Sequence, residues 1–199
     1  MKITNTDIDG VLVIAPRIFP DKRGRFLETF QAERYTAAGI TGPFVQDNMS
    51  RSVRGTLRGL HFQIRRPQAK LVHVIQGEIF DVAVDLRPGS PTFKQYVGAR
   101  LSGEDHLQLF IPEGFAHGFC VLSDEALFAY KCTDYYAPAD EGGVLWSDPD
   151  IGIDWPLADP IVSEKDAALP RLRDLRSEQL PGTARGQITA TAEKIMGRR

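Results

Sequence analysis

The chain has 199 residues, enough for one domain with a single hydrophobic core. Hydrophobic residues make up 42% and charged residues 25%, values that are typical of folded soluble proteins and exclude disorder and fibrous repeats. No apolar run reaches the roughly 18 residues of a membrane span, and the first residues lack the apolar core of a secretory signal. We therefore expect a cytoplasmic protein that does not bind membranes.

Short β-rich segments, separated by turn residues, fill most of the chain in order: 10–19, 24–30, 70–101, 107–122 and 126–138. Many short strands with frequent turns predict an antiparallel sandwich or barrel, and a jelly roll is one way to protect the sheet edges. Two helices are expected. Residues 31–38 form one, with a glycine directly after it. Residues 163–169 form the other, with Ser163 as N-cap, Asp166 in the capping-box position and Pro170 as the stop.

A basic segment from 48 to 77 contains six cations and no acid, although the net charge of the chain is −2. The six are Arg51, Arg54, Arg58, Arg65, Arg66 and Lys70. A nucleic-acid binder usually has a basic domain, whereas the pI of this chain is near 6.1, so we expect no nucleic acid and favour a small phosphorylated ligand. For most of these arginines a solvated basic surface is the commoner situation.

Several catalytic motifs are missing from the sequence. It has no phosphate loop, no G-x-G-x-x-G and no G-x-S-x-G, which argues against P-loop, Rossmann and serine-hydrolase chemistry. The stretch "PEGFAH" at 112–117 matches half of the metal-binding cupin pattern, but no H-x-H partner precedes it. We therefore expect no metal site and no cofactor.

The stretch "LRGLHFQ" at 57–63 places Arg58 and His61 three positions apart. Side chains of a regular strand alternate between faces, so these two residues would point to opposite sides of the sheet. Gly59 lies between them, and a glycine inside a strand often marks a bulge that redirects the residues beyond it. A pocket shared by the cation and the imidazole requires that bulge. A single strand histidine is otherwise more often structural than catalytic.

Two charged residues, Lys70 and Asp81, stand beside runs that read as fully buried, where a charge needs a partner or a role. For Lys70 a strand-end lysine that extends to water is an equal alternative. Further along, Tyr130, Cys132, Asp134 and Tyr136 share one strand face, so two phenols could flank one cavity. Strand aromatics are usually core residues, and the spacing alone leaves both readings open.

Six blocks in order resemble the dTDP-4-dehydrorhamnose 3,5-epimerase family of cupin-fold enzymes. They are "FPDKRGRFLETF", "FVQDNMSRSVRGTLRGLHFQ", "QAKLVHVIQGEIFDVAVDLRPGSPTF", "LFIPEGFAHGFCVLSD", "YKCTDYYAPADEGGVLWSDPDIGIDWP" and "SEKDAALP". The resemblance implies an all-β, cupin-type jelly-roll barrel with a few short helices over residues 1–172. Residues 173–199 are then an extension that we expect to be loosely packed.

The resemblance also implies roles for individual residues. His61 resembles the general base, oriented by Asp166, while Tyr130 resembles the acid on the opposite sugar face and Lys70 the residue that faces the C4 oxygen. Tyr136 resembles the ring that stacks on thymine. The matching substrate-binding positions are Arg23, Glu28, Gln46, Asp47, Asn48, Arg58, His117, Glu141 and Lys165. The family implies a homodimer whose N-terminal strand carries Arg23 and Glu28 into the neighbouring barrel.

The reaction expected from this resemblance is inversion of C3 and C5 of dTDP-4-dehydro-6-deoxy-D-glucose through enolates, without metal or cofactor. Related enzymes invert one centre or act as 3,4-ketoisomerases, and a non-catalytic sugar-nucleotide binding module is a further alternative. Two positions depart from the family pattern: Arg25 replaces an aromatic residue, and His73 replaces an arginine. Neither coincides with the expected acid, base or oxyanion residue.

Overall fold

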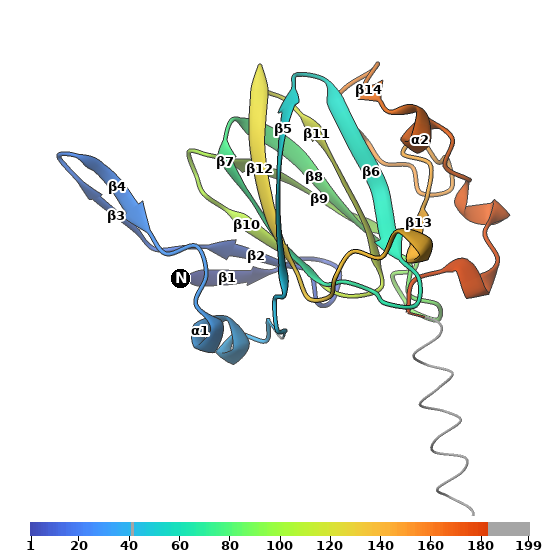
Figure 1. Cartoon of the computed structure of the whole chain (residues 1–199), viewed down its shortest axis with the longest axis horizontal. Helices are drawn as coiled ribbons and strands as arrows, with labels where there is room; N and C mark the ends of the chain where they lie inside the picture. The colour runs from blue at the N-terminus through green and yellow to red at the C-terminus, as the bar shows by residue number, and fades with distance from the viewer. Residues whose placement is uncertain (41, 183–199) are drawn as a thin grey trace, which may run out of the picture.

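The computed structural model describes residues 1–40 and 42–182. Two sheets face each other in a barrel (Figure 1). The first sheet has the order β1 (Lys2–Asn5), β2 (Leu12–Ala15), β10 (Gln108–Ile111), β7 (Lys70–Gln76), β12 (Glu125–Cys132), β5 (Gln46–Val53). The second has β13 (Glu141–Gly143), β6 (Thr56–Gln63), β11 (Phe115–Val121), β8 (Glu78–Asp85), β9 (Tyr96–Ser102), with β14 (Ile161–Val162) parallel to β6.

The path of the chain is that of a jelly roll. From β5 to β13 it alternates between the sheets, with β8 and β9 the one consecutive pair in the same sheet, and every pairing among these strands is antiparallel. The alternation lets each sheet bury its inner face against the other. The predicted all-β barrel is therefore confirmed.

The central strand β11 is buried at every residue. Its inner side contributes Phe115, Phe119 and Val121 to the core between the sheets, together with Phe128 of β12. Its outer side is covered too, because Ala116 packs with the segments that follow β13. A strand covered on both faces reads as a continuous apolar run, as this one does.

Helix α1 (Ala32–Ala37) covers the outer face of the first sheet. Tyr35 and Ile40 pack against Leu71 and Phe110 of that sheet. The Gln31 side chain caps the helix by accepting a hydrogen bond from the Arg34 amide at 2.7 Å. The helix predicted for 31–38 is confirmed, one residue shorter at each end.

The C-terminal segments cover the outer face of the second sheet, beside β6 (Figure 1). They include three short 3₁₀ turns that were not predicted: η1 (Pro138–Asp140), η2 (Leu172–Asp174) and η3 (Ser177–Gln179). Leu175 and Leu180 pack in the same apolar cluster as Leu60 and Val84. The first part of the expected extension, 173–182, thus adds to the core, and 183–199 lie outside the described residues.

Helix α2 (Glu164–Ala167) is a single turn, shorter than the predicted 163–169. The Ser163 hydroxyl caps it as predicted, accepting from the Asp166 amide at 3.1 Å. The Asp166 carboxylate instead turns toward β6, where it accepts from the Gly59 amide at 3.0 Å. The capping box is therefore half formed, because the acidic side chain has a partner outside the helix.

The predicted bulge in β6 is confirmed by its register with β11. His61 lies opposite His117 and Arg58 opposite Phe119, so three steps along β6 match two along β11. Gly59 has φ of +114°, and a Cβ there would lie 2.6 Å from the His117 carbonyl oxygen. The extra residue places Arg58 and His61 on the same side of the strand.

Strands β3 (Ile18–Asp21) and β4 (Gly24–Leu27) form a hairpin that projects away from the barrel (Figure 1). Arg25 fastens it to the turn after β9 by hydrogen bonds to the Gly103 and Glu104 carbonyls at 3.0 and 3.2 Å. Within residues 1–40 and 42–182, no helix has the length and apolar composition that crossing a bilayer requires.

Candidate active site

The inner faces of two strands, β7 and β12, change from apolar to polar at the same level of the barrel. On β7 the inward residues run from Val74 and Val72 to Lys70, and on β12 they run from Phe128 to Tyr130. The edge strand β5 presents polar residues inward along its length. Two cavities open at this level, of about 270 and 400 Å³, and they share lining residues: Asn48, His61, Lys70 and Tyr130.

His61 and Asp166 form a hydrogen-bonded pair at this cavity. Nε2 of the imidazole lies 2.8 Å from Oδ1 of the carboxylate, while Oδ2 accepts from the Gly59 amide. The His61 side chain is 30% exposed and that of Asp166 is 6% exposed. Burial raises the pKa of Asp166, but hydrogen bonds from His61 and Gly59 outweigh it, so the net pKa lies below the ordinary value. The carboxylate is therefore charged at neutral pH and holds the ring in place.

Lys70 and Tyr130 face the same space from neighbouring strands. The Lys70 Nζ lies 5.9 Å from the centroid of the Tyr130 ring. Burial lowers the pKa of Lys70 and raises the pKa of Tyr130. No carboxylate in the described part of the chain forms a salt bridge with Lys70. The site thus holds a desolvated amine without a fixed counter-ion and a phenol that stays protonated at neutral pH.

A second histidine, His117, lines the larger cavity from β11. Its Nε2 lies 2.9 and 3.1 Å from the carboxylate oxygens of Asp81, and its ring stacks on Phe128 at 6.0 Å. This pair supplies the partner that the buried charge of Asp81 required. Among the described residues, no group of three or more His, Cys, Asp and Glu side chains could hold a metal ion.

Four of the six cations in the basic segment are neutralised by carboxylates. The pairs are Arg51–Glu125, Arg54–Asp124, Arg65–Asp140 and Arg66–Asp134. Arg58 and Lys70 have no such partner within the described residues, and both line the larger cavity. The four arginine side chains are exposed, as expected for a solvated surface, but their pairing with acids means that this surface is not basic. The two remaining cations give the cavity its positive charge.

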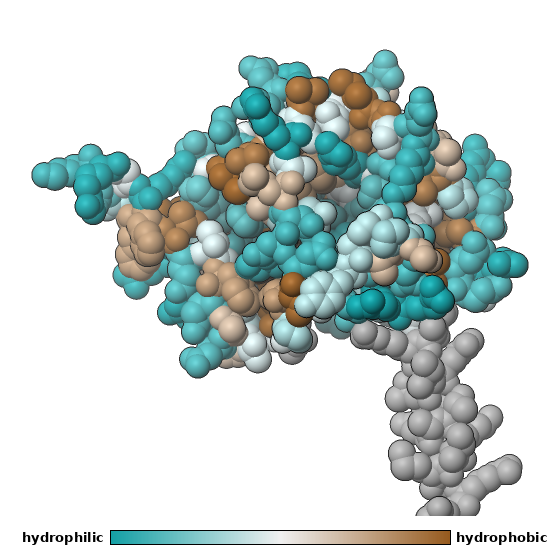
Figure 2. Space-filling view, in the orientation of Figure 1, coloured by the Kyte–Doolittle hydropathy of each residue, from teal (hydrophilic) through white to brown (hydrophobic). Residues whose placement is uncertain are grey.

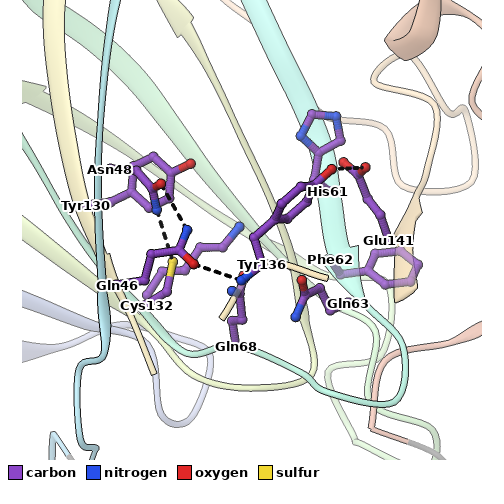
Figure 3. A pocket seen from close by; sticks show the side chains of 11 residues that line it. Gln46, Asn48, His61, Phe62, Gln63, Gln68, Tyr130, Cys132, Tyr136 and Glu141 are labelled. Carbon is purple, nitrogen blue, oxygen red and sulfur yellow. Dashed lines mark hydrogen bonds between the residues drawn. The ribbon is translucent and has the colours of Figure 1, made fainter. Parts of the chain in front are cut away.

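The smaller cavity has a hydrogen-bonded wall of uncharged and acidic groups (Figure 3). Gln46 donates to Asn48 at 3.0 Å and accepts from the Tyr136 amide at 2.8 Å. The Tyr136 hydroxyl donates to Glu141, which also pairs with Lys165 at 2.6 Å. The shared-face prediction for Tyr130, Cys132 and Tyr136 holds, since all three line this cavity.

Asp134 lies outside the face it was predicted to share, because it pairs with Arg66. Asp47 points to the outer side of β5 and pairs with Lys131 at 2.9 Å, so its side chain lines neither cavity. The strand alternation that brings in Gln46 and Asn48 sends Asp47 outward.

Arg23 and Glu28 are also away from both cavities, because they belong to the projecting hairpin. Arg23 pairs with Asp21 at 2.6 Å and Glu28 with Arg34 at 2.5 Å. The two departures from the family pattern are outside the cavities as well: Arg25 contacts the turn after β9, and His73 lies on the outer side of β7.

Sequence reasoning missed several lining residues, among them Gln63 and Ser50. Gln63 donates to the Arg66 carbonyl at 2.7 Å and accepts from the Ala137 amide at 2.7 Å, which fixes the loop that carries Tyr136. Strand parity could have found both, because Gln63 shares a face with His61, and Ser50 shares one with Asn48.

Comparison with known proteins identifies the family. The model of the dTDP-4-dehydrorhamnose 3,5-epimerase family matches residues 5–174. The chain belongs to this family. An epimerase of that name from Methanothermobacter thermautotrophicus is 54% identical over 176 residues, which are 87% of this chain and 95% of the relative. The family resemblance seen in the sequence is thus confirmed, and the chain is an enzyme of the epimerase class.

Two further relatives, a 3,5-epimerase and a 3-epimerase, bear on which sugar carbons are inverted. The crystal structure of the Legionella pneumophila enzyme in complex with dTDP-4-keto-L-rhamnose has a TM-score of 0.88 and 56% identity, covering 90% of this chain and 97% of that one. A dTDP-4-dehydrorhamnose 3-epimerase from Streptomyces niveus is 41% identical, over 90% of this chain and 88% of the relative. Relatives of both names, 3,5-epimerase and 3-epimerase, are therefore similar to this chain.

Proposed function

We propose that this enzyme inverts C3 and C5 of dTDP-4-dehydro-6-deoxy-D-glucose and releases dTDP-4-dehydro-L-rhamnose. Both carbons are adjacent to the C4 ketone, so loss of either proton gives an enolate whose charge gathers on one oxygen. One base, one acid and one cation can then serve both centres, with solvent taking the proton from the base and returning one to the acid between the two inversions. The observation that carries the proposal is the His61–Asp166 pair at 2.8 Å in a cavity that also contains Tyr130 and Lys70.

His61 is the base in this proposal. A carboxylate accepts hydrogen bonds and donates none, so Nε2 of His61 carries the hydrogen that Asp166 binds. Nδ1 then keeps its lone pair and takes the proton from C3 or C5. When the ring becomes positive, Asp166 stabilises it without moving. A base positioned in this way contributes roughly 10²–10⁴-fold.

Tyr130 is the acid, and Lys70 stabilises the enolate. Inversion needs a proton delivered to the face opposite the base, and a phenol whose pKa is raised by burial holds that proton at neutral pH. The ammonium of Lys70 has no competing carboxylate partner among the described residues, so its charge is available to the C4 oxygen. Preorganised donors of this kind contribute about 3–4 kcal/mol to the transition state.

The nucleotide binds through the remaining polar groups of the cleft. Arg58 contacts the diphosphate, because a guanidinium donates two parallel hydrogen bonds to phosphate oxygens. Tyr136, half-exposed beside Gln46 and Glu141, stacks on the thymine. Asn48, His117 and Lys165 line the part of the cavity between these ends and contact the sugar.

The proposal includes a homodimer in which the hairpin of one chain reaches the barrel of the other. The hairpin has no core of its own, and Phe26 on it is 69% exposed. Figure 2 shows apolar side chains gathered near its base. Arg23 and Glu28 lie on or next to this hairpin and line neither cavity of their own chain, which supports action across the interface.

A mixing experiment tests the exchange. Arg23→Ala and His61→Ala variants are each expected to be poorly active, whereas mixing them after partial denaturation and refolding restores activity, because one site per mixed dimer then has both residues intact. No restoration, with a dimer seen by sedimentation, would rule out the exchange.

Deuterium incorporation tests the reaction itself. The enzyme is incubated with dTDP-4-dehydro-6-deoxy-D-glucose in D₂O, and NMR is used to read label and configuration at C3 and C5. Label and inversion at both carbons support the proposal. Label at C3 alone favours a single-centre enzyme, the alternative raised by the Streptomyces niveus relative. Migration of the ketone indicates a 3,4-ketoisomerase, and saturable binding without label indicates a non-catalytic module.

A further inference from the structure

Strand β5 carries two serines on the face that it turns toward the barrel, Ser50 and Ser52, and neither has a role in the site described above. Ser52 is 6% exposed. Its hydroxyl accepts a hydrogen bond from Nε of Arg58 at 3.1 Å. Ser50 lines the larger cavity, and its hydroxyl is buried without a hydrogen-bond partner. A buried hydroxyl without a partner is uncommon in folded proteins and calls for an explanation.

The contact between Arg58 and Ser52 differs from those of the other arginines in the basic segment. Arg51, Arg54, Arg65 and Arg66 each pair with a carboxylate. A carboxylate fixes a guanidinium and also cancels its charge. A hydroxyl fixes Nε and leaves the charge intact, and no described residue is bonded to the two terminal nitrogens, which can therefore bind an anion. Arg58 is thus positioned without being neutralised.

From this arrangement we infer that Ser50 and Ser52 complete the diphosphate site, an inference that rests on the proposed dTDP-sugar substrate. Ser52 is a positioning residue, which acts by holding the Arg58 guanidinium toward the cavity. Ser50 contacts the ligand directly: its unpaired hydroxyl, buried in the free protein, donates to a phosphate oxygen after rotation about χ1 turns it into the cavity. Both residues then affect binding of the diphosphate and leave binding of the nucleoside unchanged.

Calorimetry with dTDP and with thymidine separates these roles from general damage to the fold. Ser52→Ala is expected to weaken dTDP binding roughly tenfold, because a hydrogen bond to a charged group is lost. Ser50→Ala is expected to weaken it roughly fivefold, because a neutral donor is lost. Thymidine affinity stays the same in both. Ser123→Ala is the matched control: its hydroxyl accepts from the Glu78 amide and donates to the Glu125 carbonyl, far from either cavity.

A double-mutant cycle tests whether Ser52 acts through Arg58. In the Arg58→Met background, Ser52→Ala should cost nothing further in dTDP affinity. In the wild-type background, Ser52→Thr, which keeps the hydroxyl, should bind dTDP as tightly as the wild type. Additive losses, or equal losses for thymidine, would show that Ser52 is merely structural. An unchanged dTDP affinity in Ser50→Ala would overturn the direct contact. Because binding needs no turnover, these results are independent of the deuterium experiment, and a wild-type protein that fails to bind dTDP contradicts the proposed substrate instead.

Discussion

The two histidine–aspartate pairs of the barrel are alike in hydrogen bonding and different in surroundings. Both join Nε2 to a carboxylate, at 2.8 Å in His61–Asp166 and 2.9 Å in His117–Asp81. The His61 side chain is 30% exposed and that of His117 is 7% exposed. Asp166 stands on a one-turn helix, whereas Asp81 stands in the middle of β8. The same pairing therefore leaves one histidine partly open to solvent and makes the other a buried part of the cavity wall.

Loss of the His61 imidazole should lower kcat more than any of the substitutions that follow. His61→Ala is expected to lower kcat about 10⁴-fold, the upper end of what a positioned base contributes, because the other imidazole of the cavity, His117, is buried and paired with Asp81. His61 is only partly buried, so the melting temperature should change little. Steady-state kinetics and circular dichroism check the two expectations. Residual activity within tenfold of wild type would assign the base elsewhere.

Lys70→Met tests the cation that both cavities share, without touching either pair. The variant keeps the length of the side chain and removes the charge, and kcat should fall roughly 10²–10³-fold while the affinity for dTDP stays within about threefold. In the wild type, burial lowers the pKa of Lys70, so kcat should decline on the alkaline side below the ordinary pKa of lysine, about 10.4. The pH profile of kcat measures this limb. If the alkaline decline of kcat persists in Lys70→Met, another group is responsible for it.

Substitutions of the two aspartates compare the pairs directly. Asp166→Asn should lower kcat roughly 10²-fold, because the amide no longer fixes the tautomer of His61. Asp81→Ala should change kcat less and lower the free energy of unfolding by about 1–3 kcal/mol, because it leaves His117 buried and unpaired. Steady-state kinetics and urea unfolding give kcat and the free energy of unfolding for each variant. The reverse pattern would exchange the roles assigned to the two pairs.

The smallest expected effect is a pH dependence of stability. Burial lowers the pKa of His117 in the folded state, so the unfolded chain binds more protons below about pH 6.5. Stability is then lost as the pH falls through 6.5, by at most about 1.4 kcal/mol per pH unit, and the loss ends at the folded-state pKa. His117→Gln removes this component. Urea unfolding from pH 7.5 to 5 should show a shallower decline in the variant, and equal slopes would contradict the assignment.

Much of the barrel was predictable from local patterns. Alternation and turn residues indicated the strands, and Gly59 indicated the bulge that unites Arg58 with His61. The same alternation would have placed the Asp47 side chain on the outer side of the sheet, where it lies. The family resemblance counted Asp47 as a site residue because it compares positions without regard to side-chain direction.

Other features depend on contacts between distant segments. The local sequence pattern indicated only a helix cap for Asp166, and its contact with His61, 105 positions earlier, was implied by the family resemblance alone. The partner of Asp81 could not be deduced, because the sequence offers four histidines and no rule for choosing His117. Likewise, the neutralisation of four arginines depends on acids from β12, the turn before it and the loop after it. Composition alone could not show that Arg58, unlike these four arginines, has no carboxylate partner among the described residues.

Position 59 has room for nothing larger than hydrogen. A methyl group there would meet the His117 oxygen at 2.6 Å and the Gly118 Cα at 2.7 Å, at a backbone angle that L-residues rarely adopt. Any replacement would have to push β6 away from β11, and regular alternation would then return Arg58 and His61 to opposite sides. Saturation mutagenesis of this codon should accordingly yield active enzyme with glycine alone, although Gly59 lines neither cavity.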